Sequence, residues 1–306
     1  MAAFEQGISH LSLDQGAGDL SGMEKHDASK HLFSQVDWDS YLRAGVFLSQ
    51  SEFQLLERAQ DNIDFAMGNE TSARALANLL MKLADKCTSS VPAQQYVFTR
   101  VEEILLGSED LAEFQKRALL FTVDGKNLQD APFLRALRAN DHYVQRSASA
   151  GLALLLNAAD GEYNSFIAWL CEMFTSNNPS SVEIAVPAMT ILVRHEAYRR
   201  PLLAKNCVAT IGHLLVKLGT NGNAQMIYEL CFCLWSLSLD RDCDMKVFIN
   251  ANIVQLLTDL MSAAPSRKVV RMAVSALHNL AIGESESILT EMLSGGLTKI
   301  LGNWNM

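Results

Sequence analysis

The closest pair of thiol groups along the sequence is Cys231 and Cys233, and paired cysteines at short spacing are typical ligands of zinc. Both lie in an apolar run that predicts a helix, where side chains two positions apart point about 200° apart. Since one metal ion cannot bind both, we interpret them as packing residues. The six cysteines are scattered along the chain, mostly in apolar helical runs, as expected for free thiols in a reducing compartment: Cys87, Cys171, Cys207, Cys231, Cys233 and Cys243.

The histidines offer no metal site either. None of those in the helical region has a second His or Cys three or four positions further on, which is the spacing that places two ligands on one helical face. His278 lies beside a predicted apolar stripe, so we interpret it as a partly buried packing residue. The helical region contains His142, His195, His213 and His278.

Other catalytic patterns are missing or have simpler explanations. The segment around Gly16, Gly18 and Gly22 has neither the dinucleotide-binding nor the Walker spacing, and no predicted strand precedes it. No G-x-S-x-G motif occurs. Acidic pairs such as Glu102-Glu103 fall on polar helix faces or at helix ends, where solvated charge is the ordinary explanation. We therefore expect no catalytic residue, no metal and no cofactor.

The composition narrows the class of protein. The chain has 306 residues, of which 49% are apolar and 19% charged, so it can bury a large core and is not disordered as a whole. Its 25 basic and 34 acidic residues give a net charge of −9, which argues against nucleic-acid binding. No run of about 18 apolar residues and no signal peptide occur. These features predict a cytoplasmic protein without direct membrane insertion.

The first 34 residues, rich in Gly, Ser and Asp, predict a flexible N-terminal tail, and residues 35–306 predict one helical-repeat domain. Ser49 and Glu52 have the spacing of a capping box that begins a helix. Strict alternation of apolar and polar residues is missing, so no strand is predicted.

Four segments align without gaps, and their starts are 38, 45 and 43 residues apart. Each has its apolar stripe at positions i, i+4, i+7 and i+11, and each has leucine at i+10. This period is typical of armadillo and HEAT arrays, so the chain predicts an all-α, right-handed solenoid without a sheet. Shorter helices separate the four, and Pro187 inside the second should kink or split it. The segments are Val144–Leu155, Val182–Val193, Ile227–Ser238 and Val270–Ala281.

A solenoid offers an extended surface for partners rather than a substrate pocket. Several positions opposite the stripe are apolar, and two interpretations remain open: a neighbouring helix covers them, or they line a partner groove near Phe232 that includes Ile191 and Asn279. Trp38 and Tyr41 are also open to two interpretations, because they could anchor an interface or hold the first helix on the solenoid.

Five stretches, in order along the chain, resemble motifs of the H subunit of the vacuolar-type proton-pumping ATPase. The resemblance runs from about residue 36 to 301 and includes an aromatic helix with Phe232 and Trp235. The stretches are Val36–Leu42, Pro132–Val144 (in two parts), Leu192–Arg199, Tyr228–Leu237 and Lys268–Leu280.

This resemblance implies a helical-repeat, non-catalytic regulatory subunit of the ATPase's soluble sector. It further implies binding to peripheral stalk subunits E and G, support of ATP hydrolysis and proton transport, and a peripheral position on the cytoplasmic side of vacuolar or other endomembranes. His278 replaces the arginine that usually precedes Asn279 in the family. The family's C-terminal domain is expected to be absent, so its inhibitory and coupling roles are not transferred.

The alternative is a general armadillo adaptor that binds a peptide or protein. Importin-alpha-like adaptors bind peptides through Trp and Asn residues four positions apart. Here Leu239 follows Trp235 at that spacing, and Ser275 precedes Asn279. The missing ladder counts against a peptide receptor of that type.

Overall fold

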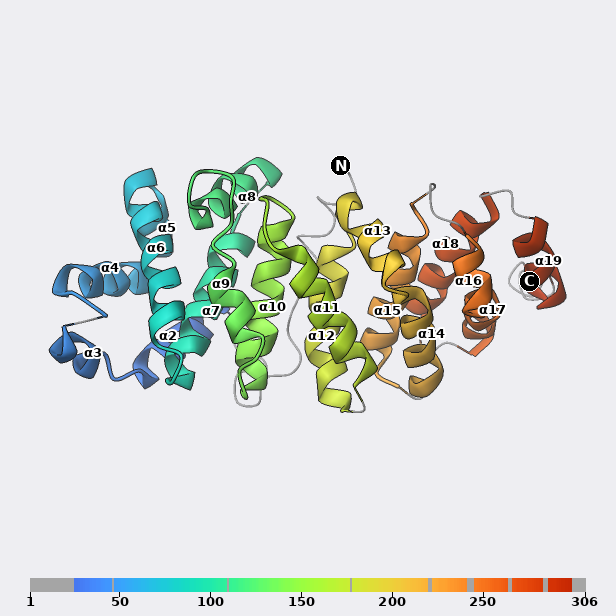
Figure 1. Ribbon diagram of the computed structural model, residues 1–306, viewed down its shortest axis with the longest axis horizontal. Coiled ribbons are helices and arrows are strands. Elements are labelled where there is room, and N and C mark those ends of the chain that lie inside the picture. Colours follow the sequence, from blue (N-terminus) through green and yellow to red (C-terminus); the bar gives the residue numbers. More distant parts are fainter. Residues whose placement is uncertain are drawn as a thin grey trace. The chain divides into compact units, whose positions relative to one another are not determined.

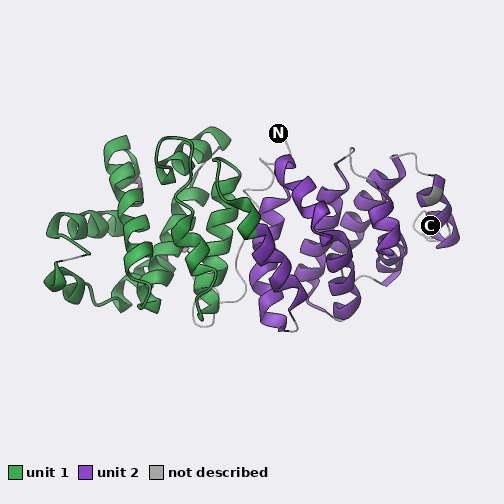
Figure 2. Ribbon diagram, in the orientation of Figure 1, with its two compact units in different colours: residues 1–166 green, residues 167–306 purple. Residues whose placement is uncertain are grey.

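The computed structural model describes residues 25–298 except 46, 109, 177, 220–221, 241–244, 264–265 and 283–285. These residues form α-helices, one short 3-10 helix and no extended strand; two isolated bridges, Thr122 with Leu128 and Asn127 with Asp160, are the β contacts recorded among them. The chain divides into two compact units, residues 1–166 and 167–306 (Figure 2).

Unit 1, at the blue-to-green end of the colour bar in Figure 1, contains the helices α2 (Lys25–Gln35), α3 (Trp38–Ala44), α4 (Gln50–Asp61), α5 (Ile63–Met67), α6 (Glu70–Lys86), α7 (Val91–Leu106), α8 (Leu111–Ala118), η1 (Leu119–Phe121), α9 (Ala131–Ala136) and α10 (His142–Leu156). Helix α11 (Tyr163–Thr175) crosses the boundary between the units. Unit 2 then contains α12 (Pro179–Leu192), α13 (Glu196–Ala204), α14 (Cys207–Leu218), α15 (Ala224–Leu237), α16 (Lys246–Asn250), α17 (Ile253–Ala263), α18 (Arg267–Ile282) and α19 (Glu286–Ser294).

Short polar side chains begin many of these helices, because they accept hydrogen bonds from backbone N–H groups that the first turn leaves without partners. The predicted capping box is confirmed: the Ser49 hydroxyl accepts from the Glu52 N–H, and the Glu52 carboxylate accepts from the Ser49 N–H. Side-chain caps of the same kind precede other helices at Asn69, Ser90, Asp110, Asp141, Asn178 and Asn223.

The predicted boundary of the flexible tail at residue 34 is placed too late. Helix α2 already begins at Lys25, and Ala28, Ser29 and Leu32 are buried. These three buried residues are too few to produce a clear helical periodicity in the sequence. Helix α2 is stabilised by its packing against α4 and α7. Residues 1–24, the rest of the expected tail, lie outside the described residues.

Arg100 joins three helices at the centre of unit 1. Its side chain is completely buried on α7, where its guanidinium donates to the Ser29 hydroxyl of α2 at 3.2 Å. It also donates to the Ala59 carbonyl of α4 and to the carboxylate of Glu103 on α7. A buried cation is stable only when such partners replace water, so Arg100 links the position of α2 to that of α4 and α7.

The four predicted repeat helices are confirmed as α10, α12, α15 and α18. The leucine at the shared position is buried in every one of them. In unit 2, α15 packs against α12, α14 and α18, and α17 packs against α18. The fold is therefore an all-α helical-repeat solenoid of the armadillo/HEAT type. The buried leucines are Leu154, Leu192, Leu237 and Leu280.

The fourth helix departs from the predicted stripe. In α18, Val270, Val274 and Ala281 are half-buried and only Leu277 of the predicted stripe is buried, whereas every position one residue earlier is buried. In α15 the predicted stripe is buried, and the earlier series is buried except at Met226, because α12, α14 and α18 all pack against this helix. The earlier series in α18, which lies against α15 and α17, is Val269, Ala273, Ala276 and Leu280.

Pro187 does not split the second repeat helix, contrary to the expectation. Helix α12 runs continuously from Pro179 to Leu192 although proline cannot donate to the carbonyl of Glu183. An interior proline costs a helix about 3 kcal/mol. Every residue from Ile184 to Leu192 is buried, so the packing of α12 offsets this cost.

Replacing Arg100 with methionine should lower the free energy of unfolding by about 3–5 kcal/mol, since breaking a buried ion pair leaves the Glu103 carboxylate, which is 8% exposed, without its cation. Chemical denaturation measures the change. The control is Arg135→Met, which removes a surface ion pair between Asp85 and Arg135, whose side chain is 48% exposed. This substitution should lower the free energy of unfolding by less than about 1 kcal/mol. Equal effects of the two substitutions would contradict the role of Arg100.

Leu237→Ala should destabilise the protein by about 2–5 kcal/mol, because Leu237 is fully buried on α15 and its removal leaves a cavity. Thermal and denaturant unfolding measure this. The matched control is Leu239→Ala, two residues further on, where the side chain is 37% exposed and the cost should stay below about 1 kcal/mol.

Candidate partner-binding surface

The part of the chain that the structure describes contains no cluster of three or more His, Cys, Asp or Glu side chains that could hold a metal ion. Cys231 and Cys233 are both buried, and burial raises the pKa of each thiol. His278 is exposed, so its expected partial burial is wrong. Across the described residues, every helix is too short or too polar to cross a bilayer.

Half-buried aromatic and cationic side chains gather on one side of α15 in unit 2. The Arg194 guanidinium, just after α12, lies 4.9 Å from the centre of the Phe232 ring. The Phe232 and Trp235 rings are 5.4 Å apart and inclined by 51°. Together with Tyr228 and Asn279 these residues define what we call the Phe232 surface: Arg194, Tyr228, Phe232, Trp235 and Asn279, all half-buried.

Arg194 is held in place at this surface. Its Nε donates to the Thr190 carbonyl at 3.2 Å, which is the last turn of α12. Burial lowers the pKa of the guanidinium, and interactions with Tyr228 and Cys233 oppose that shift. An arginine stays charged in such a site, so a fixed positive charge lies against an aromatic ring.

Hydrogen bonds between successive repeats support the same region from behind. The Ser236 hydroxyl of α15 donates to the Val193 carbonyl at the end of α12, at 2.7 Å. The Asn279 amide of α18 donates to the Ser238 hydroxyl after α15, at 3.1 Å. Both serines are buried, so these polar contacts fix the spacing of α12, α15 and α18 beneath the aromatic side chains.

The structure separates the residues that the sequence grouped as a possible partner groove. Phe232 and Asn279 retain exposed surface, whereas Ile191 is 1% exposed. For Ile191 the other interpretation holds, because its side chain is buried within the protein. Phe232 and Asn279 as partner contacts stay a prediction.

Trp38 and Tyr41 belong to a different region, an aromatic cluster in unit 1. Trp38 is 6% exposed, and its indole N–H donates to the Phe33 carbonyl at 2.9 Å. Its ring lies 5.6 Å from Tyr96 of α7, so Trp38 holds α3 against the solenoid and is not an exposed anchor. Tyr41 is half-buried beside it, with its pKa raised by burial. As a partner contact, Tyr41 stays a prediction.

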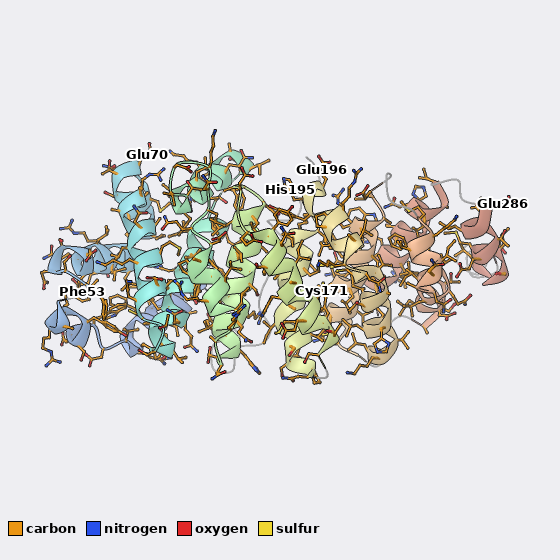
Figure 3. All side chains as sticks on the ribbon, viewed as in Figure 1. Phe53, Glu70, Cys171, His195, Glu196 and Glu286 are labelled. Atoms are coloured by element: carbon orange, nitrogen blue, oxygen red, sulfur yellow. The ribbon has the colours of Figure 1, made fainter. Side chains whose placement is uncertain are left out.

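One close pair of thiols was missed from the sequence. The sulphur atoms of Cys171 on α11 and Cys207 at the start of α14 lie 3.6 Å apart (Figure 3 labels Cys171). The two residues are separated by 36 positions, and no short motif contains both. Only the packing of α11 and α14 brings them together.

Solved structures resemble this fold at low sequence identity. A crystal structure of an engineered protein matches 85% of this chain and 98% of its own, with a TM-score of 0.55 and 18% identity. Another engineered protein matches 84% and 99%, with a TM-score of 0.53 and 17% identity. At these identities the likeness shows the fold alone.

Sequence relatives are more specific. A Dictyostelium discoideum protein described as the H subunit of the V-type proton ATPase is 24% identical over 283 residues, which cover 90% of this chain and 62% of that protein. An Oryza sativa subsp. japonica protein described as a probable H subunit of the V-type proton ATPase is 23% identical over 308 residues, covering 89% and 64%. This chain therefore spans less than two thirds of the length of these relatives.

A family model described as the H subunit of the V-ATPase matches residues 25–305. That range begins at the first residue of α2, extends through most of both compact units and includes the Phe232 surface. The chain therefore belongs to the V-ATPase H subunit family.

Proposed function

We propose that this chain is a non-catalytic regulatory subunit in the soluble sector of a vacuolar-type proton-pumping ATPase. It binds the peripheral stalk subunits E and G and supports ATP hydrolysis and proton transport by the assembled enzyme. The observation that carries this proposal is the family match, which extends over nearly all of the helical-repeat region. Membership of the family supports the role, and the stalk contacts follow from the resemblance.

The character of the Phe232 surface supports a binding role. Tyr, Trp, Phe and Arg are enriched in protein interfaces, and Trp, Tyr and Arg are the side chains whose truncation most often costs much binding energy. Here Arg194, Phe232 and Trp235 are already ordered by one another before any partner binds. A partner segment with apolar and acidic side chains would match their chemistry.

The same proposal assigns a place in the cell. A regulatory subunit of the soluble sector would lie on the cytoplasmic side of a vacuolar or other endomembrane and reach it through other subunits. The net charge of −9 supports this, since anionic lipid surfaces repel an acidic protein. Binding through protein partners then replaces direct contact with lipid.

A second candidate function is a general armadillo-type adaptor for a peptide or protein. The Phe232 surface favours it as well, because aromatic side chains on repeat helices are suited to binding an extended segment. Against it, Leu239 and Ser275 occupy positions where a Trp and Asn ladder would continue. The adaptor interpretation therefore becomes an outcome of the binding experiment.

Titration of the purified chain with the purified E–G stalk pair should show saturable binding in the micromolar range or tighter. ATP hydrolysis should then rise when the chain is added to a soluble sector that lacks its H subunit. The chain alone should not hydrolyse ATP. A folded, helical sample that fails to bind the stalk pair would favour the adaptor, whereas binding without activation would remove only the hydrolysis part of the proposal.

Phe232→Glu should weaken binding to the stalk pair by tenfold or more, which corresponds to about 1.4 kcal/mol, because it replaces an aromatic contact with a charge. The matched control is Val216→Glu, which adds the same charge on α14, where the valine is 66% exposed. Isothermal titration calorimetry measures both affinities, and circular dichroism melts check folding. If Phe232→Glu folds and binds as the unmodified chain does, this surface is not the contact site.

A further inference from the structure

We propose that Cys171 and Cys207 form a reversible redox site, which closes into a disulfide when the chain meets a peroxide. This proposal is independent of the proposed function, since it rests on the geometry of unit 2 alone. It would make the packing of α11 against α14 responsive to oxidants.

The geometry already places the two sulphur atoms in contact. Their distance of 3.6 Å must shorten by about 1.5 Å to reach the length of a disulfide bond. Cys207 is the first residue of α14 and follows Asn206, whose φ of 59° is left-handed and whose side chain makes no capping hydrogen bond. The end of a helix adjusts more easily than its interior, so a small shift of Cys207 is feasible.

The two thiols are in different environments and have different roles. A hydrogen bond from Cys207 and the positive charge of Lys205 lower the pKa of Cys171, although partial burial opposes the shift. Cys207 is buried, and its hydrogen bond to Cys171 and its burial raise its pKa. Cys171, which retains exposed surface, is thus the thiolate that an oxidant reaches first.

The chemistry balances with hydrogen peroxide as the oxidant. The Cys171 thiolate attacks one peroxide oxygen, the O–O bond breaks, and hydroxide leaves, which gives a sulfenic acid on Cys171. Cys207 then loses its proton, and its sulphur attacks the sulphur of that sulfenic acid. The S–S bond forms, the S–O bond breaks, and the released hydroxide takes up the proton as water. Two thiols and one peroxide become one disulfide and two waters.

The neighbouring cysteines lack this arrangement. Cys233 of α15 interacts electrostatically with Cys207, yet it is fully buried and burial raises the pKa of its thiol. Cys231 and Cys87 are likewise buried with raised pKa values, and Cys243 lies outside the described residues. Among the described cysteines, Cys171 alone combines exposed surface, a cationic neighbour and a thiol within contact distance.

A disulfide here would tie two helices of unit 2 together. Cys171 lies on α11 and Cys207 begins α14, and the segment between them contains α12 and α13. Closing this segment reduces the freedom of the unfolded chain, so oxidation should raise the midpoint of thermal unfolding by several degrees. Reduction by a dithiol would reverse the change.

Peptide mass spectrometry of the full chain tests the proposal. After brief treatment with hydrogen peroxide and alkylation of the remaining thiols, trypsin should release peptide 147–194, which contains Cys171, linked to peptide 206–217, which contains Cys207. Dithiothreitol should abolish the linked peptide. The remaining cysteines fall in other tryptic peptides, so their alkylation in the same sample is an internal control.

Two variants separate the roles of the thiols. Cys207→Ser keeps a hydrogen-bond donor beside Cys171 but cannot form the disulfide, so dimedone should trap a sulfenic acid on Cys171. In Cys171→Ser, neither the linked peptide nor the trapped acid should form. Dimedone should label the unmodified chain weakly, because Cys207 removes the sulfenic acid.

Lys205→Gln tests the electrostatic effect of Lys205 on the Cys171 thiol, which a purely structural role of Lys205 would not produce. Alkylation of Cys171 by iodoacetamide should have its midpoint at a higher pH in this variant, because the thiolate loses a neighbouring cation. Lys217→Gln, at the far end of α14, is the control and should leave the midpoint unchanged. The proposal is overturned if peroxide gives no peptide linking Cys171 to Cys207, or if Cys171 is only over-oxidised to the sulfinic acid.

Discussion

The structure depends on one constraint, which is that no repeat can cover its own apolar stripe. A helix such as α15 has apolar residues on two adjoining series of positions, and nearly all of them are buried because α12, α14 and α18 pack against it. In α18 the series Val269, Ala273, Ala276 and Leu280 is buried, while only Leu277 of the other series is buried. The stability of such an array is a sum of the stability of each repeat and of its interfaces with the neighbouring repeats. The fold of unit 2 therefore depends on contacts between neighbouring helices more than on any single core.

The N-terminal part of unit 1 meets the same constraint with different residues. There, α2 covers one side of α7, and its position is fixed by the buried guanidinium of Arg100 rather than by a long apolar stripe. An aromatic cluster around Trp38, Phe33 and Tyr96 closes the region between α2, α3 and α7. Each hydrogen-bond donor of a buried guanidinium that loses its partner costs free energy. The hydrogen bonds of Arg100 therefore favour one packing of α2, α4 and α7 over others.

Local patterns were enough to predict the four repeat helices and one capping box, because helical spacing and capping depend on residues within one or two turns. The four repeat helices and the Ser49–Glu52 box are of this kind. Contacts between distant residues were not predictable in this way. Helix α2 has too few apolar residues for a periodic signal, Pro187 is tolerated because its helix is buried, and Ile191 is covered by the protein itself. Cys171 and Cys207 meet only after α11 and α14 have packed.

Helix α15 carries both the candidate binding surface and a wall of the thiol site. Successive residues on a helix point about 100° apart, so Phe232 and Cys233 lie on different faces of α15, although both interact with Arg194. Phe232 lies against Arg194 at the surface, whereas Cys233 is buried and interacts with Cys207. A shift of α14 on closing a disulfide would therefore act on a face of α15 about 100° away from the half-buried Phe232. Since close-packed interiors transmit displacement, α15 is one physical route by which a change at the thiol site would reach the Phe232 surface.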